Sequence, residues 1–232
     1  MSVTKGHRID LPVPRNLEMR WRKIPVAVTV DLDPVIRQIT PDIRPLLPIG
    51  RQPLLFGRAV TVACEPPDFG AVLHGVDAAE MGDILVIAAG GHKGNAMIGD
   101  ILCGQLRSKD VGGVICDGAI RDVATLATWE NFPVYTKHIN PRGPIGNQEG
   151  VVNCPVVVGD VEITPDDYIM GDDDGLVAMS PEELEDWIDA AEARLELEEE
   201  WQASLSEGKT MQEVFSLDLV VPSPDNDNVC KP

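Results

Sequence analysis

The segment VGGVICDGAIRD, which runs from Val111 to Asp122, leads from small apolar residues into a cation beside a carboxylate. We expect a strand over 111–116 and the substrate chemistry immediately after it. The guanidinium of Arg121 offers a planar fork that matches a substrate carboxylate, and Asp122 supplies a hard oxygen ligand for Mg²⁺ or Mn²⁺. Together these two residues can hold a 2-oxo acid on a metal ion.

A second glycine-rich segment, GGHKGNAMIGDIL, runs from Gly90 to Leu102 and follows the apolar run 84–89. The pattern is typical of a strand, a glycine loop and a helix start, which points free backbone N–H groups at an anion. We therefore expect the two segments to converge on one small anionic substrate.

Strand and helix patterns alternate through the middle of the chain, which is an α/β signature. We expect strands over 57–64, 84–89, 111–116 and 134–137, and helices over 71–79, 100–107 and 122–130. Later strands are expected over 151–158, 161–163 and 176–179, with turns at 159–160 and 171–175. Five prolines between 31 and 53 interrupt any long helix and favour short helical turns around the periphery of the active site.

A long helix is predicted near the C-terminus, where Ser180, Pro181 and Glu183 form a capping Ser, a first-position Pro and a third-position Glu. A helical stripe of apolar residues continues to about Ser206 through Leu184, Trp187, Ile188, Ala191, Leu195 and Leu205. An amphipathic helix of this length is expected to pack on its own core or on another subunit.

Composition excludes several classes of protein. A chain of 232 residues with 44% hydrophobic content can bury the core of one α/β domain. Its formal charge of −19, from 19 basic and 38 acidic residues, argues against a nucleic-acid partner. No apolar run approaches the roughly 18 residues of a membrane span, so no membrane partner is expected.

The five cysteines show no C-x-x-C spacing, and no apolar leader precedes the first strand, so a reduced, cytoplasmic compartment is expected. Cys103 and Cys116 lie in apolar or small-residue runs, which favours buried small side chains over nucleophiles.

The motifs quoted above resemble the RraA-like superfamily. The resemblance covers roughly residues 25–205 and also includes GDILV at 82–86, FPV at 132–134, NPRGP at 140–144 and GDDDGLV at 171–177. The superfamily contains class II 4-hydroxy-4-methyl-2-oxoglutarate / 4-carboxy-4-hydroxy-2-oxoadipate aldolases and the regulator of ribonuclease E activity A. It implies a swivelling-domain-like central β structure flanked by helices. On this basis we divide the chain into an N-terminal arm (1–25), an aldolase-like domain with its C-terminal helix (26–206) and a polar tail (207–232).

The resemblance also implies residue roles. Asp122 would be the one direct protein ligand of the metal, and Arg121 would bind substrate and act in catalysis. The matching substrate segment is Gly99, Asp100, Ile101 and Leu102, whose main-chain amides would receive the carboxylate of pyruvate. Asp100 would also help to orient a metal-bound water, which is our expected base. The family commonly builds homotrimers or homohexamers with sites at subunit interfaces.

Other interpretations of these residues stay open at the level of sequence. Arg121 could form a surface salt bridge, Asp122 could cap the following helix, and Asp100 could complement a helix dipole. His92 lies in a glycine loop, where a solvent-exposed side chain is more typical than a substrate contact. The acidic run 172–174 resembles a calcium loop in composition only, and a tight turn is favoured.

The predicted activity is metal-assisted retro-aldol cleavage of a 4-hydroxy-2-oxo diacid to pyruvate and a second oxo acid, in which Arg121 neutralises the developing enolate. Oxaloacetate decarboxylation is the expected side activity. The alternative is a regulatory protein that binds a protein partner without turnover. We also expect an acid from a neighbouring subunit's C-terminal helix to complete the site, chosen from Glu196, Glu198, Glu199 and Glu200.

Overall fold

The computed structural model describes residues 2–8 and 12–218. The chain divides into two compact units between Ala191 and Glu192, which is a point inside the long helix rather than after it. Residues 219–232, with Cys230 and most of the predicted tail, lie outside the described residues.

The strands, in chain order, are β1 Thr4–Lys5, β2 Arg37–Gln38, β3 Arg44–Pro45, β4 Leu55–Ala63, β5 Ile84–Ala88, β6 Ala96–Ile98, β7 Gly113–Ile120, β8 Val134–Ile139, β9 Val151–Val152, β10 Val156–Val158, β11 Val161–Ile163, β12 Tyr168–Gly171 and β13 Leu176–Met179. The helices are α1 Arg15–Trp21, α2 Val26–Val30, α3 Gly70–Ala78, α4 Asp100–Ser108, α5 Val123–Leu126, α6 Pro181–Ser206 and α7 Met211–Phe215.

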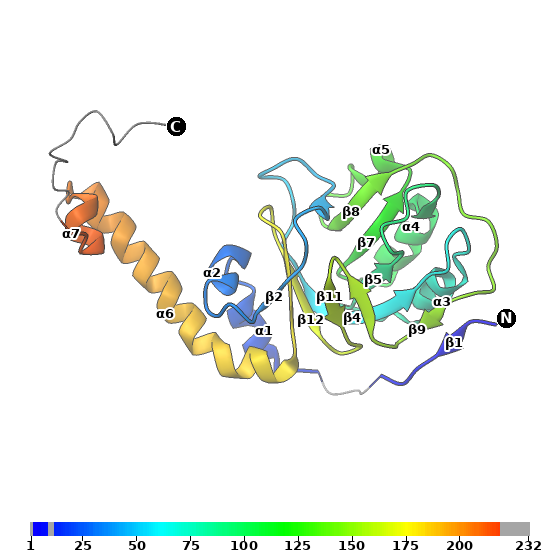
Figure 1. The fold of residues 1–232 in the computed structure, drawn as a ribbon, viewed down its shortest axis with the longest axis horizontal. Helices are drawn as coiled ribbons and strands as arrows, with labels where there is room; N and C mark the ends of the chain where they lie inside the picture. Colours follow the sequence, from blue (N-terminus) through cyan, green and yellow to red (C-terminus); the bar gives the residue numbers. More distant parts are fainter. Residues whose placement is uncertain (1, 9–11, 219–232) are drawn as a thin grey trace, which may run out of the picture. The chain divides into compact units, whose positions relative to one another are not determined.

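A mixed sheet forms the centre of the first unit, and its strand order is β2-β13-β12-β4-β5-β7-β8-β3 (Figure 1). Its middle strands β4, β5, β7 and β8 are mutually parallel, and the strands toward both edges pair antiparallel. The short strand β6 also pairs parallel with β7. The carboxyl ends of these parallel strands therefore meet at one edge of the sheet, where ligands of open α/β sheets bind.

Alternating side chains divide the core into two layers on opposite faces of the sheet. One layer joins Val114 and Cys116 of β7 to residues of α3 and α4, including Val72 and Leu106. The other joins Ile115 of β7 to the β10–β11 hairpin and to β12. Period-two alternation along a strand requires this division, because successive side chains point to opposite faces.

The α/β fold with a long C-terminal helix agrees with the sequence prediction, and α6 has the predicted bounds. The capping box is present, since Ser180 N–H donates to Glu183 and Glu183 N–H donates to the Ser180 hydroxyl. Several elements differ from the prediction. Strand β12 was not predicted, because its residues run into the glycine-bounded turn that follows. The region 31–53 contributes strands β2 and β3 rather than helical turns alone.

The helix predicted over 122–130 is much shorter than expected, because α5 ends at Leu126. The N–H groups of Thr128 and Trp129 donate to carbonyls three residues back, a pattern of 3₁₀ turns. The Thr128 hydroxyl also donates to the Thr125 carbonyl at 2.7 Å, and this hydrogen bond competes with a continued helix.

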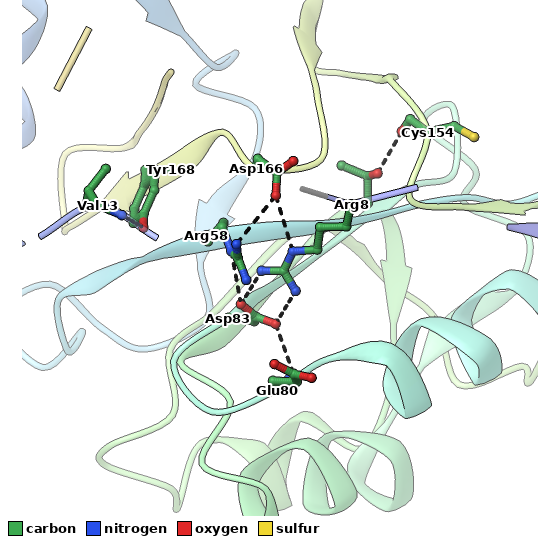
Figure 2. Close-up of polar contacts among 9 residues, drawn as sticks. Arg8, Val13, Arg58, Glu80, Asp83, Cys154, Asp166 and Tyr168 are labelled. Carbon is green, nitrogen blue, oxygen red and sulfur yellow. Dashed lines mark hydrogen bonds and ion pairs between the residues drawn. The ribbon is translucent and has the colours of Figure 1, made fainter. Parts of the chain in front are cut away.

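The predicted N-terminal arm is tied to the first unit by a cluster of ion pairs (Figure 2). Strand β1 pairs parallel with β9 at Thr4 and Val151. The Arg8 guanidinium then donates to both carboxylate oxygens of Asp83. Arg58 lies 3.9 Å from Asp83 and 3.6 Å from Asp166. All four charged side chains are largely buried, so each one depends on the others for its charge compensation.

The arm also contains helix α1, which packs against the rest of the first unit. Trp21 at the end of α1 is fully buried, and its indole N–H donates to the Leu184 carbonyl of α6 at 2.9 Å. Within α6, the predicted stripe residues Leu184, Ile188 and Ala191 are buried. The first turns of α6 thus belong to the core of the first unit.

The second unit contains the end of α6 and helix α7. The rings of Trp201 and Phe215 lie 4.9 Å apart, and the Arg194 guanidinium lies 5.1 Å from the Trp201 ring centroid. Thr210 and Glu213 form a capping box that begins α7. No helix among the described residues is long and apolar enough to cross a membrane.

Candidate functional site

Parallel strand pairing brings three sequence motifs together at one edge of the sheet. Ile98 of β6 is in register with Ile120 of β7, and the Arg121 N–H donates to the Ile98 carbonyl at 3.1 Å. Ile120 is in register with Ile139 of β8, and the Asn140 N–H donates to the Ile120 carbonyl at 3.0 Å. Because the strands run in one direction, the residues that follow each strand emerge side by side.

A cavity of about 370 Å³ lies among these segments. It combines one cation and one carboxylate with apolar side chains from α3, β6 and α4. Its lining residues are Phe69, Leu73, Ala96, Met97, Ile98, Gly99, Ile101, Leu102, Arg121, Asp122, Gly143 and Pro144.

Asp122 has a left-handed backbone, with φ 59° and ψ 31°, a conformation that Asp tolerates better than most residues. It occupies the cap position of α5, yet its side chain makes no capping hydrogen bond there. The Oδ2 atom instead accepts the Asp100 N–H at 3.2 Å and lies 3.3 Å from Arg121 Nε. About a third of the side chain is exposed. Because the carboxylate makes no capping hydrogen bond, it can bind a group in the cavity.

Two glycines without positive φ make room for the Arg121 side chain. A Cβ on Gly143 would lie 2.6 Å from Arg121 Nη1, and a Cβ on Gly99 would lie 2.9 Å from Arg121 Cγ. The same atom on Gly99 would also clash with Asp122 Oδ2. A side chain at either position would have to displace the Arg121 side chain, so space rather than backbone strain favours glycine there.

The N-terminus of α4 opens toward the same cavity. Gly99 is its cap residue, and Asp100, Ile101 and Leu102 form its first turn. The N–H groups of Ile101 and Leu102 have no acceptor within the helix, which favours an anion at this end. The Asp100 N–H is taken by Asp122, and Asp100 itself does not line the cavity, unlike its two neighbours.

The donor set at this cavity suits Mg²⁺ better than a metal that needs several protein ligands. Within 2–8 and 12–218, no group of three or more His, Cys, Asp and Glu side chains could hold a metal ion. Mg²⁺ keeps several waters and is bound through one or two carboxylates. The half-open Asp122 carboxylate fits that requirement, and the exposed cavity leaves room for the waters.

The predicted convergence of the two glycine-rich segments holds for Gly99, Ile101 and Leu102, which line the cavity with Arg121, but it was wrong for Gly90 and Gly91. The Ala89 N–H donates to Asp117, and the N–H groups of Gly90 and Gly91 bind the same carboxylate. The anion that this loop receives is thus a side chain of the neighbouring strand. Gly90, Gly91 and Asp117 line a separate cavity on the other face of the sheet.

Burial raises the pKa of Asp117, although these three N–H groups and the charge of Lys137 act in the opposite direction. His92 in the same loop has a structural role, since its Nε2 accepts the Asn95 N–H at 2.9 Å. His92 does not line the cavity that contains Arg121.

Two other sequence interpretations are confirmed as structural. The acidic turn accepts backbone N–H groups, from Val26 to Asp172 at 2.9 Å and from Gly50 to Asp173 at 3.0 Å. Burial raises the pKa of the Cys64 thiol to about 12, and burial also raises the pKa values of Cys103 and Cys116. These thiols are therefore not nucleophiles at neutral pH.

Sequence reasoning assigned no role to the residues that complete the cavity. Phe69 and Leu73 lie one helical turn apart at the start of α3, and Gly143 and Pro144 follow β8. The NPRGP motif was a signal for the second pair, because it was part of the family resemblance. The apolar spacing of Phe69 and Leu73 is indistinguishable from ordinary core packing.

Asp68 joins the start of α3 to the loop residues Gln148 and Glu149. Its buried carboxylate accepts the N–H groups of Gly70 at 2.7 Å, Gln148 at 3.0 Å and Glu149 at 3.1 Å. Burial alone would raise the pKa of Asp68, but these hydrogen bonds outweigh it and lower the pKa below its ordinary value.

Comparisons with known proteins agree with this architecture. Residues 31–178 match the family model described as RraA-like, Aldolase/RraA. A Halalkalibacterium halodurans protein named "Putative 4-hydroxy-4-methyl-2-oxoglutarate aldolase" is 28% identical over 204 residues, which are 88% of this chain and 95% of that protein.

Two solved structures share the fold at low sequence identity. A Pseudomonas syringae pv. tomato protein aligns with a TM-score of 0.78 at 22% identity, over 88% of this chain and 99% of that one. The RNA-processing inhibitor RraA from Thermus thermophilis aligns with a TM-score of 0.60 at 23% identity, over 67% of this chain and 92% of that one. Because the family model spans more than half of its residues, the chain belongs to the RraA-like family.

Proposed function

We propose that this protein is a divalent-metal-dependent class II aldolase, a lyase that cleaves a 4-hydroxy-2-oxo acid to pyruvate and a second oxo compound. The name of the Halalkalibacterium halodurans relative suggests a diacid substrate. The proposal includes oxaloacetate decarboxylation as a side activity, because both reactions pass through the enolate of pyruvate.

The observation that carries the proposal is the register of β6 and β7, which sets the first turn of α4 beside Arg121 and Asp122. Free N–H groups, a guanidinium and a carboxylate then border one cavity. This combination suits a small 2-oxo acid together with a hard cation.

Each residue has a distinct role in the proposed reaction. Asp122 would hold the divalent cation, which supplies a Lewis acid for the charge that develops on the 2-oxo oxygen. Arg121 and the N–H groups of Ile101 and Leu102 would bind the substrate carboxylate. Arg121 would also offset the charge of the enolate as the C3–C4 bond breaks.

The proton of the C4 hydroxyl must leave to a base. Among the described lining residues, Asp122 is the only carboxylate and no His, Lys or Tyr is present. A water in the cavity is therefore our candidate base. Asp100 does not line the cavity, and its part would be to hold the Asp122 carboxylate in place through its N–H.

The direct test is pyruvate release from oxaloacetate and from 4-hydroxy-4-methyl-2-oxoglutarate by protein stripped with EDTA and then supplied with Mg²⁺ or Mn²⁺. Because divalent cations alone decarboxylate oxaloacetate, each rate is compared with a protein-free control. We expect metal-dependent release well above that control. Rates equal to the control with both substrates and both metals would contradict the aldolase proposal. They would favour a regulatory protein that binds a protein partner without turnover.

A further inference from the structure

The segment that follows β8 lies against the Arg121 side chain. Strands β6 and β8 both pair with β7 at Ala119 and Ile120, so they flank the end of the strand that Arg121 follows. After β8 the chain continues through residues 140–144, and a Cβ on Gly143 would lie 2.6 Å from Arg121 Nη1. The Gly143 backbone is therefore in contact with the guanidinium, and its position limits where the planar fork can point.

Two hydrogen bonds fasten this segment to the residues at the start of β6. The side-chain amide of Asn95 donates from Nδ2 to the Gly143 carbonyl at 2.6 Å. The Ala96 N–H donates to the Arg142 carbonyl at 2.7 Å. The second bond is made by the backbone, so any residue except proline could form it, whereas the first requires a side-chain donor. Asn95 thus fixes the carbonyl of the glycine that contacts Arg121.

Asn95 is itself firmly held. The residue is only 8% exposed, and its N–H donates to His92 Nε2 at 2.9 Å. The segment that it holds contains Pro141 and Pro144, which have no N–H to donate and so cannot continue the strand pairing of β8. Asn95 does not line the cavity, so any effect on a bound substrate must pass through its neighbours.

We infer that Asn95 is a positioning residue for Arg121. By holding the Gly143 carbonyl, it keeps the Gly143 backbone against the guanidinium, and the fork then faces the cavity. The inference rests on the proposed function, in which Arg121 binds the substrate carboxylate. Loss of the Asn95 amide would free the segment to move, and a displaced fork would bind the carboxylate less well.

A double-mutant cycle with Arg121 separates positioning from a general structural role. The probe is oxalate, which has the planar shape and the charge of the pyruvate enolate, and its Kd is measured by calorimetry with Mg²⁺ present. We expect Asn95→Ala to weaken oxalate binding by at least about tenfold. In an Arg121→Lys background, which has no fork to position, the same change should weaken binding by less than about threefold. Equal factors in the two backgrounds would overturn the inference.

The same cycle is measured in kcat/KM for pyruvate release from oxaloacetate, so that turnover and binding are read separately. Asn95→Asp has the size of Asn without the amide donor, and it replaces Asn95→Ala in the cycle if that variant does not fold. Unfolding of both variants would show a role in the fold itself and would overturn the inference.

Thr61→Val is the matched control. The buried Thr61 hydroxyl also donates to a loop carbonyl, that of Cys154 at 2.7 Å, and Thr61 does not line the cavity. We expect Thr61→Val to leave oxalate binding and kcat/KM unchanged. A loss equal to that of Asn95→Ala would overturn the inference, because any broken hydrogen bond would then have the same effect.

Failure of the proposed function would be recognised separately. Wild-type protein that binds oxalate but releases no pyruvate would contradict the aldolase proposal, while the cycle in oxalate Kd would still decide the role of Asn95. Wild-type protein that neither binds oxalate nor releases pyruvate would overturn both.

Discussion

At the scale of single residues, the proposed activity depends on how the Arg121 side chain is held. Its guanidinium lies 3.3 Å from Asp122 through Nε, and Gly143 leaves space beside Nη1. We expect Gly143→Ala to lower kcat/KM for pyruvate release by about tenfold or more, because the new methyl group must displace the guanidinium. Gly104→Ala is the matched control, since its nearest atom would be 3.7 Å away and activity should not change. Equal activity of both variants would remove Gly143 from the site.

The chemistry of the Arg121 side chain leads to a second prediction at this scale. Arg121→Lys keeps the positive charge but loses the planar fork that binds a carboxylate through two hydrogen bonds. We expect kcat/KM to fall by at least about tenfold, which corresponds to about 1.4 kcal/mol. Steady-state kinetics with oxaloacetate measure this effect. An unchanged kcat/KM would return Arg121 to the role of a surface ion-pair partner.

At the scale of elements, Asp68 joins the start of α3 to the 147–149 loop through three backbone N–H groups. Asp68→Asn should cost about 1.5 kcal/mol at pH 7 and lower Tm by about 3–6 °C. Because folding lowers the Asp68 pKa, its contribution is complete above its ordinary value of 3.8 and is lost as pH falls through the folded-state pKa. The Tm difference between wild type and variant should therefore shrink below about pH 4. A difference that is constant from pH 7 to pH 3 would contradict this role.

Strands and helices were predicted from the sequence more successfully than the contacts between them. The apolar run before Arg121 and the capping box before α6 act through local chain geometry, so both could be predicted. The hydrogen bonds from the Gly90 loop to Asp117 could not be predicted from the sequence, because they depend on the pairing of β5 with β7. The same limit applies to Phe69 and Leu73, whose contact with the cavity depends on how α3 packs against the sheet.

At the scale of the whole molecule, we propose a homotrimer or homohexamer in which a C-terminal acid of one subunit completes the site of another. Glu198 is paired with Arg194 at 2.9 Å, and Glu196, Glu199 and Glu200 are exposed. Truncation after Leu195 should break the assembly or weaken Mg²⁺ binding by about 10–100-fold. Truncation after Gly208 keeps α6 intact and serves as the control. Light scattering and metal titration that match wild type after the shorter truncation would contradict this proposal.

The divalent-cation dependence of pyruvate release in wild type and in Asp122→Asn bears most directly on the proposed function. Asn has the size of Asp and can still accept the Asp100 N–H, but it lacks the negative charge that holds a hard cation. Asp110→Asn is the matched control, because Asp110 also has a left-handed backbone and does not line the cavity. We predict a rate that rises with Mg²⁺ and saturates in wild type and Asp110→Asn, and a rate at the protein-free level in Asp122→Asn. A folded Asp122→Asn protein with near wild-type turnover at modest Mg²⁺ would contradict the metal site and the mechanism built on it.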